Sequence, residues 1–309
     1  MDLTSRKDIQ NLLKKYETHP LEKLGQNFLI NKRAIKELIK AADLKKNDVV
    51  LEIGPGIGVL TMELAKKVKK VIAIEKDPRM CEILGELLEC WNVRNVELVE
   101  GDILKLDPKP YTLKPYKVVA NLPFYLTAPV IRKFLETIEP SPQQMVLVAQ
   151  KEVGQRICAK PPEMSILAVS VQFYVHPVKS SRSEFNRAGP EIISYVSRKS
   201  FWPSPKVDSA IIRITPRQPA PYRNEVSGAG FRERFFEIVK AGFSHPRKQL
   251  INNLSHLRQG FGGQAKKFDR ERIRNWLLKN NVKPSQRAET LTVENWISLT
   301  RIAMKAKRT

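Results

Sequence analysis

The sequence is poor in cysteine and histidine. Its 309 residues contain three cysteines and four histidines. The cysteines, Cys81, Cys90 and Cys158, are odd in number, form no CxxC pair, and have no histidine at metal-ligand spacing. This composition argues against a disulfide framework and against a zinc site. We therefore expect free thiols in a reducing compartment and no bound metal.

Long apolar runs are also missing. The longest nearly unbroken run, residues 166–175, is interrupted by Ser170 and Gln172 and is far shorter than the roughly 18 residues that cross a bilayer. The first residues, MDLTSRKDIQNLLKKYETH, have no apolar core and carry acidic residues early, which argues against a signal or transit peptide. We expect a cytoplasmic protein that does not associate with membranes.

Acidic residues are outnumbered by basic ones. There are 54 lysines and arginines against 32 acidic residues, a net charge of +22. A proline-rich stretch, TPRQPAPYRNEVSGAG, interrupts the pattern after Pro216, and residues 217–309 carry +13 of the excess. This distribution predicts two domains, 1–216 and 217–309. We expect the second domain to bind the phosphates of a nucleic acid. The alternative is a solubilising surface of lysine and arginine.

Short apolar runs alternate with helical patterns between residues 31 and 205. Strand and helix alternating at this spacing predict an α/β fold with a mostly parallel sheet covered by helices on both faces. Residues 217–309 predict a small all-helical domain instead. We expect strands at residues 49–53, 71–74, 96–99, 117–120, 145–149, 192–196 and 207–214. We expect helices at residues 59–65, 78–90, 128–137, 164–173, 231–242, 246–253, 269–279 and 293–305.

A glycine-rich turn follows the first of these strands, as Glu52-Ile-Gly54-Pro-Gly56-Ile-Gly58. The spacing is GxGxG, and Val59 stands where the GxGxxG of a nicotinamide site needs its third glycine, which disfavours a dehydrogenase. Such glycines let the backbone approach a ligand closely. Glu75, at the end of the next strand, can accept from both hydroxyls of a ribose.

The third strand ends at Gly101-Asp102-Ile103. Asp102 can accept a hydrogen bond from an adenine amino group, and Ile103 can pack on the adenine ring. Ligands of such sheets bind at the carboxyl ends of the strands. Acceptors for adenosine with no site for a pyrophosphate indicate S-adenosylmethionine as the cofactor.

The fourth strand ends at Asn121-Leu122-Pro123-Phe124. An exocyclic amine on a purine is a weak nucleophile because its lone pair is delocalised into the ring. The Asn121 side-chain oxygen and the Leu122 carbonyl can hold its N–H groups and favour a tetrahedral nitrogen. Pro123 stiffens the turn, and Phe124 offers a face to a flipped base.

Together these motifs closely resemble the small-subunit ribosomal RNA adenine N6,N6-dimethyltransferases. The resemblance spans most of the chain and includes both predicted domains. Its residues are Gly25-Gln26-Asn27-Phe28-Leu29, the turn at 52–58, Glu75, Gly101-Asp102, Asn121 to Phe124, Phe201-Trp202-Pro203-Ser204-Pro205-Lys206-Val207-Asp208-Ser209-Ala210, His245-Pro246-Arg247-Lys248 and Pro284-Ser285-Gln286-Arg287-Ala288-Glu289.

The resemblance implies a Rossmann-like methyltransferase joined to a helical domain, and it assigns roles to named residues. The catalytic set is Asn121, Leu122, Pro123 and Phe124. The implied cofactor-binding set is Asn27, Leu29, Gly54, Glu75, Asp102, Ile103 and Asn121. In this set Asn27 and Leu29 would close over the cofactor, and Gly54 would line its methionine part. The implied RNA-binding set is Phe124, Phe201 as a second aromatic against the target base, and Arg247 and Lys248 on phosphates.

The implied reaction transfers methyl groups to N6 of two adjacent adenines near the 3′ end of small-subunit ribosomal RNA, in the course of small-subunit biogenesis. The expected partner is this RNA, free or in a pre-30S particle, and we expect a monomer. Two alternatives stay open. One is methylation of an adenine in large-subunit RNA, and the other is a ribosome-assembly or transcription factor that uses the fold without catalysis.

The sequence departs from the family pattern in three places. Phe124 stands where tyrosine is common, which removes a hydroxyl and keeps the stacking face. The segments VHPVKSSRSEFNRAG, before Pro190, and LRQGFGGQA, at residues 257–265, look like insertions. Both are polar and without periodicity, so we expect them to form surface loops. The first is close enough in sequence to Phe201 to alter the shape of the target pocket.

Overall fold

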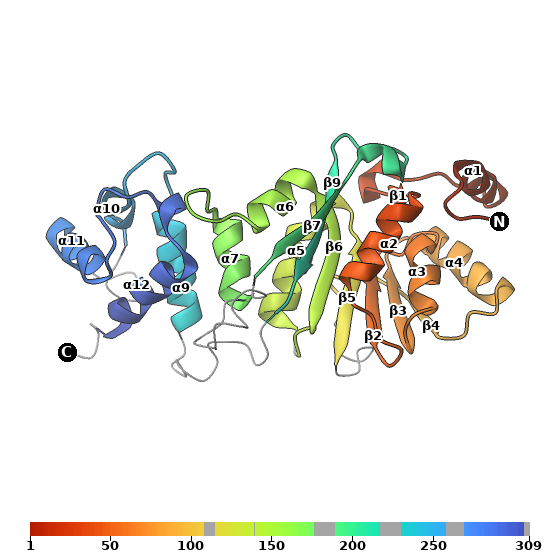
Figure 1. The fold of residues 1–309 in the computed structure, drawn as a ribbon, viewed down its shortest axis with the longest axis horizontal. Coiled ribbons are helices and arrows are strands. Elements are labelled where there is room, and N and C mark those ends of the chain that lie inside the picture. Colours follow the sequence, from red (N-terminus) through yellow and green to blue (C-terminus); the bar gives the residue numbers. More distant parts are fainter. Residues whose placement is uncertain (108–114, 139, 176–188, 217–229, 258–268, 306–309) are drawn as a thin grey trace. The chain divides into compact units, whose positions relative to one another are not determined.

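The computed structural model describes residues 1–107, 115–138, 140–175, 189–216, 230–257 and 269–305 (Figure 1). The chain forms two compact units. The sheet unit comprises Met1–Gln155 and Asn186–Gln218, and the helical unit comprises Arg156–Phe185 and Pro219–Thr309. The proline-rich stretch at 217–229 and most of the two expected insertions, at 176–188 and 258–265, lie outside the described residues.

A seven-stranded sheet forms the centre of the sheet unit, in the order β4-β3-β2-β5-β6-β9-β7. The first five strands in this order run parallel, and β9 runs antiparallel to both β6 and β7. The mostly parallel sheet is therefore confirmed. The strands are β2 (Val49–Ile53), β3 (Lys70–Glu75), β4 (Val96–Glu100), β5 (Tyr116–Asn121), β6 (Gln144–Gln150), β7 (Glu191–Val196) and β9 (Ser209–Ile214).

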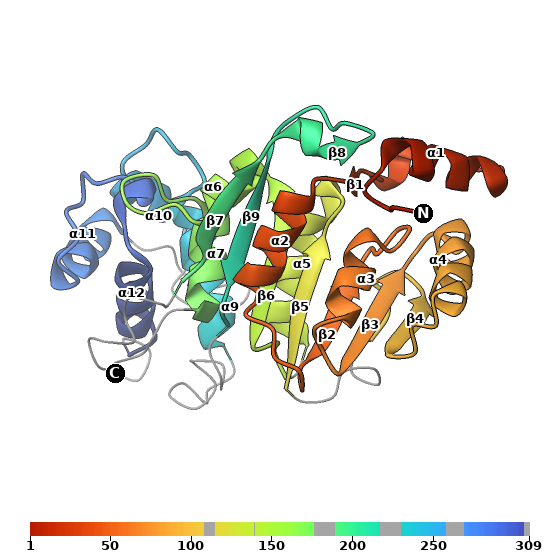
Figure 2. The same cartoon turned by 45° about the vertical axis from the view of Figure 1, so that its right-hand side comes forward.

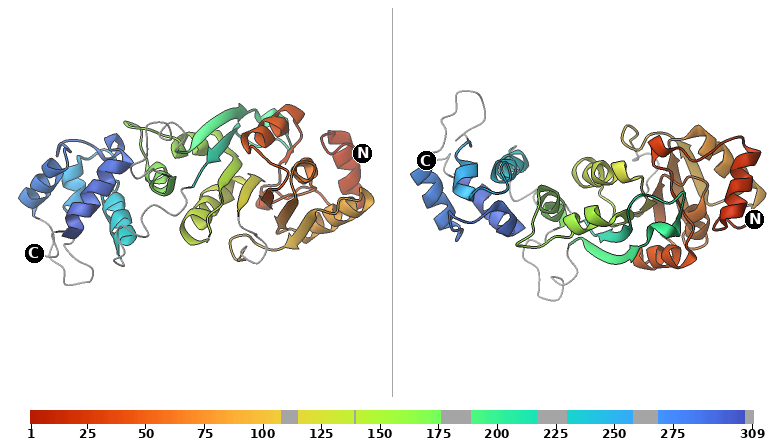
Figure 3. Two further views of the ribbon diagram at one scale, coloured as in Figure 1. Left: turned by 60° about the horizontal axis from the view of Figure 1, so that its bottom comes forward. Right: turned by 90° about the horizontal axis from the view of Figure 1, so that it is seen from above.

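Helices cover both faces of this sheet. Helix α2 (Lys32–Ala41) and helix α5 (Thr127–Arg132) lie on opposite sides (Figure 3). Side chains of α1 (Arg6–Lys15), α3 (Val59–Ala65) and α4 (Pro78–Cys90) share one hydrophobic cluster with those of α2. Helix α5 continues into η3 (Lys133–Thr137), and α6 (Lys151–Ile157) follows β6. The helices α1, α2 and α6 were not among those predicted.

The central strands are buried because they are covered on both sides. All five residues of β2 are buried, including the acidic Glu52. Short apolar runs without alternation are typical of parallel strands in this position. Local signals set the helix ends: the Asp77 side chain accepts from the backbone N–H of Arg79, and Pro78 occupies the first turn of α4.

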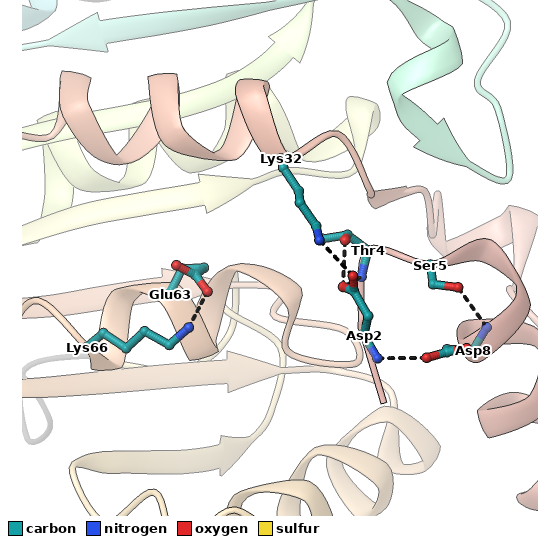
Figure 4. Close-up of polar contacts among 7 residues, drawn as sticks. All are labelled: Asp2, Thr4, Ser5, Asp8, Lys32, Glu63 and Lys66. Carbon is teal, nitrogen blue, oxygen red and sulfur yellow. Dashed lines mark hydrogen bonds and ion pairs between the residues drawn. The ribbon is translucent and has the colours of Figure 1, made fainter.

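A second, two-stranded sheet joins distant parts of the chain. Strand β1 (Phe28–Leu29) pairs antiparallel with β8 (Phe201–Trp202) at the end of the main sheet toward which β5 points (Figure 2). The first residues of the chain are tied to α2, because the Lys32 ammonium donates to Asp2 at 2.7 Å (Figure 4). Asp2 also accepts from the Thr4 hydroxyl. Strand β1 pairs with β8, and residues 27–29 line one pocket together with residues from the strand ends of the main sheet.

The helical unit contains α7 (Ile166–Val175), α9 (Phe231–Gly242), α10 (Leu250–Leu254), α11 (Arg270–Lys279) and α12 (Val293–Lys305). Helix α7 precedes the expected boundary at 216/217 and yet belongs to this unit. The reason is that α7 is apolar on nearly all sides and packs against α9 and α12. Phe173 of α7 stacks on Phe235 of α9, with ring centroids 4.2 Å apart.

No helix in the described parts of the chain is long and apolar enough to cross a membrane. Within the same residues, no three side chains among histidine, cysteine, aspartate and glutamate come together in a way that could hold a metal ion.

Candidate active site

A pocket opens at the carboxyl ends of β2, β3, β4 and β5, beside β1. The structure brings all seven residues of the predicted cofactor set to its wall, namely Asn27, Leu29, Gly54, Glu75, Asp102, Ile103 and Asn121. The segment 24–29, the turn after β2, the end of β3, residues 101–104 and the turn after β5 form this wall. Parallel strands converge at one edge, so residues far apart in sequence meet there.

The turn after β2 is built from glycines in the left-handed region of backbone conformation. Gly54, Gly56 and Gly58 have φ values of 68°, 58° and 87°. A Cβ at Gly58 would come within 2.5 Å of the Leu84 side chain, and one at Gly56 within 2.9 Å of the Phe28 ring. Both the conformation and the close packing therefore require glycine.

Glu75 is held by the backbone of this turn and of its own strand end. One carboxylate oxygen accepts from the N–H of Gly56 at 2.9 Å, and the other accepts from Lys76 and Asp77 at 2.8 and 2.9 Å. The side chain is buried, and burial raises the pKa of Glu75, while the three N–H groups oppose that shift. The lone pairs that these bonds leave over are available to a ligand.

Asp102 follows β4 and lines the same pocket as the glycine turn. Its Oδ2 is 2.9 Å from the Lys76 ammonium, and its Oδ1 accepts from the N–H of Leu104 at 2.9 Å. Hydrogen bonding to Lys76 is the main cause that holds the pKa of Asp102 below its usual value. Ile103, beside it, is buried and gives the pocket an apolar side.

Asn121 ends β5, and its amide is oriented by the segment before β1. The Asn121 Nδ2 donates to the carbonyl of Asn27 at 2.9 Å, while the Asn27 amide donates to the carbonyl of Gly25 at 3.1 Å. With its N–H₂ group engaged in this way, Asn121 presents Oδ1 as an acceptor to the pocket that it lines.

The rest of the predicted catalytic motif is divided between the core and the pocket. Leu122 is buried, and its N–H donates to the carbonyl of Val148 at 3.4 Å. Pro123 lines the pocket, whereas Phe124 opens the short helix η2 (Phe124–Leu126) and is partly buried outside the pocket wall. The next residue, Tyr125, lines the pocket and is 51% exposed.

Phe201 and the basic pair are not part of the pocket wall. Phe201 is 4% exposed and belongs to the hydrophobic core, where β8 pairs it with Leu29. Its role against a target base stays a prediction. Arg247 and Lys248 are exposed in the turn between α9 and α10, in the helical unit.

The sequence prediction assigned no role to four polar residues of the pocket wall: Gln26, Glu52, Lys76 and Tyr125. Gln26 donates to Asp77 at 2.6 Å and accepts from the N–H of Leu21, so it anchors the segment before β1. Glu52 could have been noticed as the one charged residue inside an apolar strand run. Lys76 and Tyr125 carry no signal in the sequence beyond their position after a motif residue.

Glu52 is the most unusual side chain of the site. It is 1% exposed, and its Oε2 has no hydrogen-bond partner. Burial raises the pKa of Glu52 to about 8, and the charge of Glu75 adds to the increase. The nearby Thr61 hydroxyl favours the ionised form of Glu52 and so lowers its pKa. The geometry is not that of a hydrogen bond between the Thr61 hydroxyl and Glu52 Oε2.

The comparisons with known proteins agree with this geometry. A family model described as "Ribosomal RNA adenine dimethylase" matches residues 20–299. The ribosomal RNA small subunit methyltransferase A of Dehalococcoides mccartyi is 37% identical over 289 residues, which cover 93% of this chain and 89% of that protein. The protein of the same name from Bacillus mycoides is 36% identical over 306 residues, 96% of each chain.

Solved structures agree on the fold. A dimethyladenosine transferase from Plasmodium falciparum superposes with a TM-score of 0.70 at 24% identity and covers 90% of this chain and 97% of its own. The 23S rRNA methyltransferase ErmE gives 0.67 at 26% identity, covering 89% and 98%. The expected Rossmann-like methyltransferase fold is confirmed, and the chain belongs to the ribosomal RNA adenine dimethylase family.

Proposed function

We propose that this chain transfers methyl groups from S-adenosylmethionine to N6 of two adjacent adenines near the 3′ end of small-subunit ribosomal RNA, giving N6,N6-dimethyladenosines. The observation that carries the proposal is the arrangement of Glu75, Asp102 and Asn121 around one pocket at three successive strand ends. The small-subunit enzymes that are 36–37% identical over nearly the whole chain support this substrate over large-subunit RNA.

The pocket fits S-adenosylmethionine in its chemistry. Glu75 and Asp102 would accept from the ribose hydroxyls and the adenine amino group, and the buried Ile103 would pack against the adenine ring. The orphaned oxygen of Glu52 is suited to a ligand that carries positive charge. When bound, the cofactor supplies an electrophilic methyl group on a sulfonium.

The target amine is held by the end of β5. Asn121 keeps its Oδ1 as an acceptor because its Nδ2 is engaged by Asn27. This oxygen and the Leu122 carbonyl accept from the two N–H groups of the amine and favour a tetrahedral nitrogen. Positive charge develops on that nitrogen as the new bond forms, so these acceptors gain strength in the transition state. No strong base is needed.

The phosphates of the RNA are bound by exposed cations outside the pocket. Arg247 and Lys248 are the residues we assign to phosphate contacts, supported by the excess positive charge of residues 217–309. Phe124 supplies the stacking face for the base, and the partly exposed ring of Tyr125 lies beside it on the pocket side. We propose that the chain acts as a monomer on immature small subunits.

The test is incubation of the purified chain with methyl-labelled S-adenosylmethionine and undermethylated small subunits, followed by nucleoside analysis. The expected result is N6,N6-dimethyladenosine at two adjacent positions near the 3′ end of the small-subunit RNA. Large subunits and their RNA serve as the control. Label in large-subunit RNA alone would favour the large-subunit alternative, and binding without any label would favour a non-catalytic assembly factor.

A further inference from the structure

Glu52 is a buried carboxyl group that takes no part in the proposed methyl-transfer step. It lies in the middle of the sheet, in β2 between β3 and β5, where its register partners are Ala73 and Val119. Its Oε2 has no hydrogen-bond partner, although the residue lines the pocket. A buried polar oxygen without a partner costs free energy, so a ligand that satisfies it gains correspondingly.

Glu52 lies two residues before Gly54, which begins the turn after β2, and both residues line the pocket. Gly54 is the residue that we assign to the methionine part of the cofactor, where the cationic groups are. Glu52 therefore stands beside the position at which positive charge arrives.

Among the residues that the structure describes, the side chains that act on Glu52 are those of Glu75 and Thr61, and neither is positively charged. From β3, the facing group is the carboxylate of Glu75, which has the same sign. From α3, it is the hydroxyl of Thr61, and from β5 the neighbour is the apolar Val119. A carboxyl group in such surroundings holds its proton at neutral pH, and the pKa of Glu52 is raised accordingly, to about 8.

We propose that Glu52 is the proton-releasing group of the cofactor pocket: it ionises when S-adenosylmethionine binds, and the resulting buried carboxylate favours this cofactor over the uncharged-sulfur product. The proposal rests on the proposed function, since it takes S-adenosylmethionine as the ligand. In the binding step the O–H bond of Glu52 breaks, the electron pair stays on the carboxylate, and the proton leaves to solvent. No oxidation or reduction occurs.

The charges of the two ligands explain the preference. S-adenosylmethionine carries a sulfonium, an ammonium and a carboxylate, a net charge of +1, whereas S-adenosylhomocysteine lacks the sulfonium and is neutral. A buried carboxylate is stabilised by nearby positive charge, so its pKa falls further with the first ligand. After methyl transfer the sulfur is neutral, Glu52 takes a proton back, and the product is held less tightly than the cofactor.

Proton release is measured by isothermal titration calorimetry of S-adenosylmethionine at pH 7 in phosphate and in Tris. The slope of the binding enthalpy against the ionisation enthalpy of the buffer gives the number of protons released. A carboxyl with a pKa of about 8 that is ionised in the complex releases about 0.9 proton at pH 7. The dissociation constant should then fall by up to about tenfold between pH 6 and pH 7. S-adenosylhomocysteine should release fewer protons.

The Glu52→Gln variant keeps the shape of the side chain and removes its titration. It should release close to no proton, and its affinity for the cofactor should be nearly flat between pH 6 and pH 7. Glu63→Gln is the matched control, because Glu63 is a partly exposed glutamate of α3 that pairs with Lys66 outside the pocket (Figure 4). This control should behave like the unmodified protein.

A second measurement needs no variant. Infrared difference spectra of the unmodified protein, with and without the cofactor, should show a protonated carboxyl band replaced by carboxylate bands. Absence of this change would overturn the proposal. So would undiminished proton release by Glu52→Gln, which would assign the proton to another group such as Glu75, or equal proton release with both ligands. Failure to bind S-adenosylmethionine at all would instead refute the proposed function.

Discussion

The pocket of the sheet unit and the basic turn of the helical unit hold their functional side chains in different ways. Glu75 is buried, and three backbone N–H groups fix its two oxygens. Arg247 and Lys248 are exposed in a short turn. In the pocket, hydrogen bonds fix the positions of Glu75, Asp102 and Asn121, so function there depends on geometry. In the turn, function depends on how much charge is present.

The two regions should therefore respond differently to substitution. Water cannot replace a lost partner inside a buried site, so a change there has a large effect that is specific to one residue. Exposed cations act on RNA through a field that many lysines and arginines share, and salt screens that field. Substitutions in each region allow the two responses to be compared. We expect the largest effect for a substitution in the pocket.

Asn121→Ala removes the acceptor that we assign to the target nitrogen. Loss of one preorganised group of this kind typically costs on the order of 100- to 1000-fold in rate. The variant should bind RNA normally and the cofactor somewhat more weakly, and the rate loss should persist when both substrates saturate. Single-turnover methylation of undermethylated small subunits is the measurement. A near-normal rate would remove Asn121 from the mechanism.

Glu75→Ala removes the acceptor assigned to the ribose. Affinity for S-adenosylmethionine should fall by about 1.5 to 3 kcal/mol, the range for hydrogen bonds to a charged group. Calorimetry measures this directly, and RNA affinity should not change. The control is Glu97→Ala, because Glu97 is a partly exposed glutamate of β4 that pairs with Lys70 of β3. If the folded Glu75 variant bound the cofactor with unaltered affinity, the pocket would be misassigned.

Alanine substitutions at two glycines test how tightly each unit is packed, through their effect on the free energy of unfolding. A Cβ added at Gly242, at the end of α9, would lie 2.3 Å from the Trp296 ring, so Gly242→Ala should destabilise the helical unit by about 1 to 3 kcal/mol. A Cβ at Gly85, inside α4, would meet open space. Gly85→Ala should therefore stabilise the sheet unit by roughly 0.5 to 1 kcal/mol. Denaturant melts of each variant test both signs.

Charge reversal of Arg247 and Lys248 tests the basic turn. The logarithm of RNA affinity should fall less steeply with the logarithm of salt concentration, by about one unit of slope for each lost phosphate contact. Cofactor affinity should stay the same. The same reversal at Lys14 and Lys15 of α1 is the control, since these cations belong to the other unit. An unchanged slope would place Arg247 and Lys248 on a solvated face.

The sequence predicted those parts of the fold that follow from local pattern. Strand β2 and helices α3, α4, α9 and α12 have the expected bounds, because the spacing of their apolar residues defines them. Helices α1, α2 and α6 were missed, although the side chains of Ser5 and Asn31 cap the first turns of α1 and α2. The membership of α7 in the helical unit is a tertiary effect, since nothing in its own sequence says which partner covers an all-round apolar helix.

The candidate site was predictable where a motif ends a strand. Glu75, Asp102 and Asn121 each follow an apolar run, and parallel strands bring such positions to one edge. The unpaired oxygen of Glu52 could not be foreseen, because it depends on what the neighbouring strands and α3 fail to supply. The ion pair between Lys76 and Asp102 depends likewise on the spacing of two strand ends, which sequence alone does not give.

Lys76→Met tests that ion pair and should have the smallest effect, because the Lys76 side chain is about half exposed and such pairs contribute roughly 0.2 to 1 kcal/mol. At pH 7.5, S-adenosylmethionine should bind at most a few-fold more weakly. Lys76 keeps the pKa of Asp102 low, so without it that pKa rises toward its usual value.

We assign the adenine amino group to Asp102, and the ionised carboxylate is a stronger acceptor than the protonated carboxyl, so affinity should fall as pH falls through the pKa of Asp102. The acid side of the affinity profile should therefore move to higher pH in Lys76→Met than in the unmodified protein. Calorimetric titrations between about pH 3 and pH 6, a range that includes the usual value of 3.8, measure this shift, with Lys66→Met as a control at an exposed pair outside the pocket. Identical profiles would mean that Lys76 does not tune Asp102, and that the two residues share the pocket wall without coupling to cofactor binding.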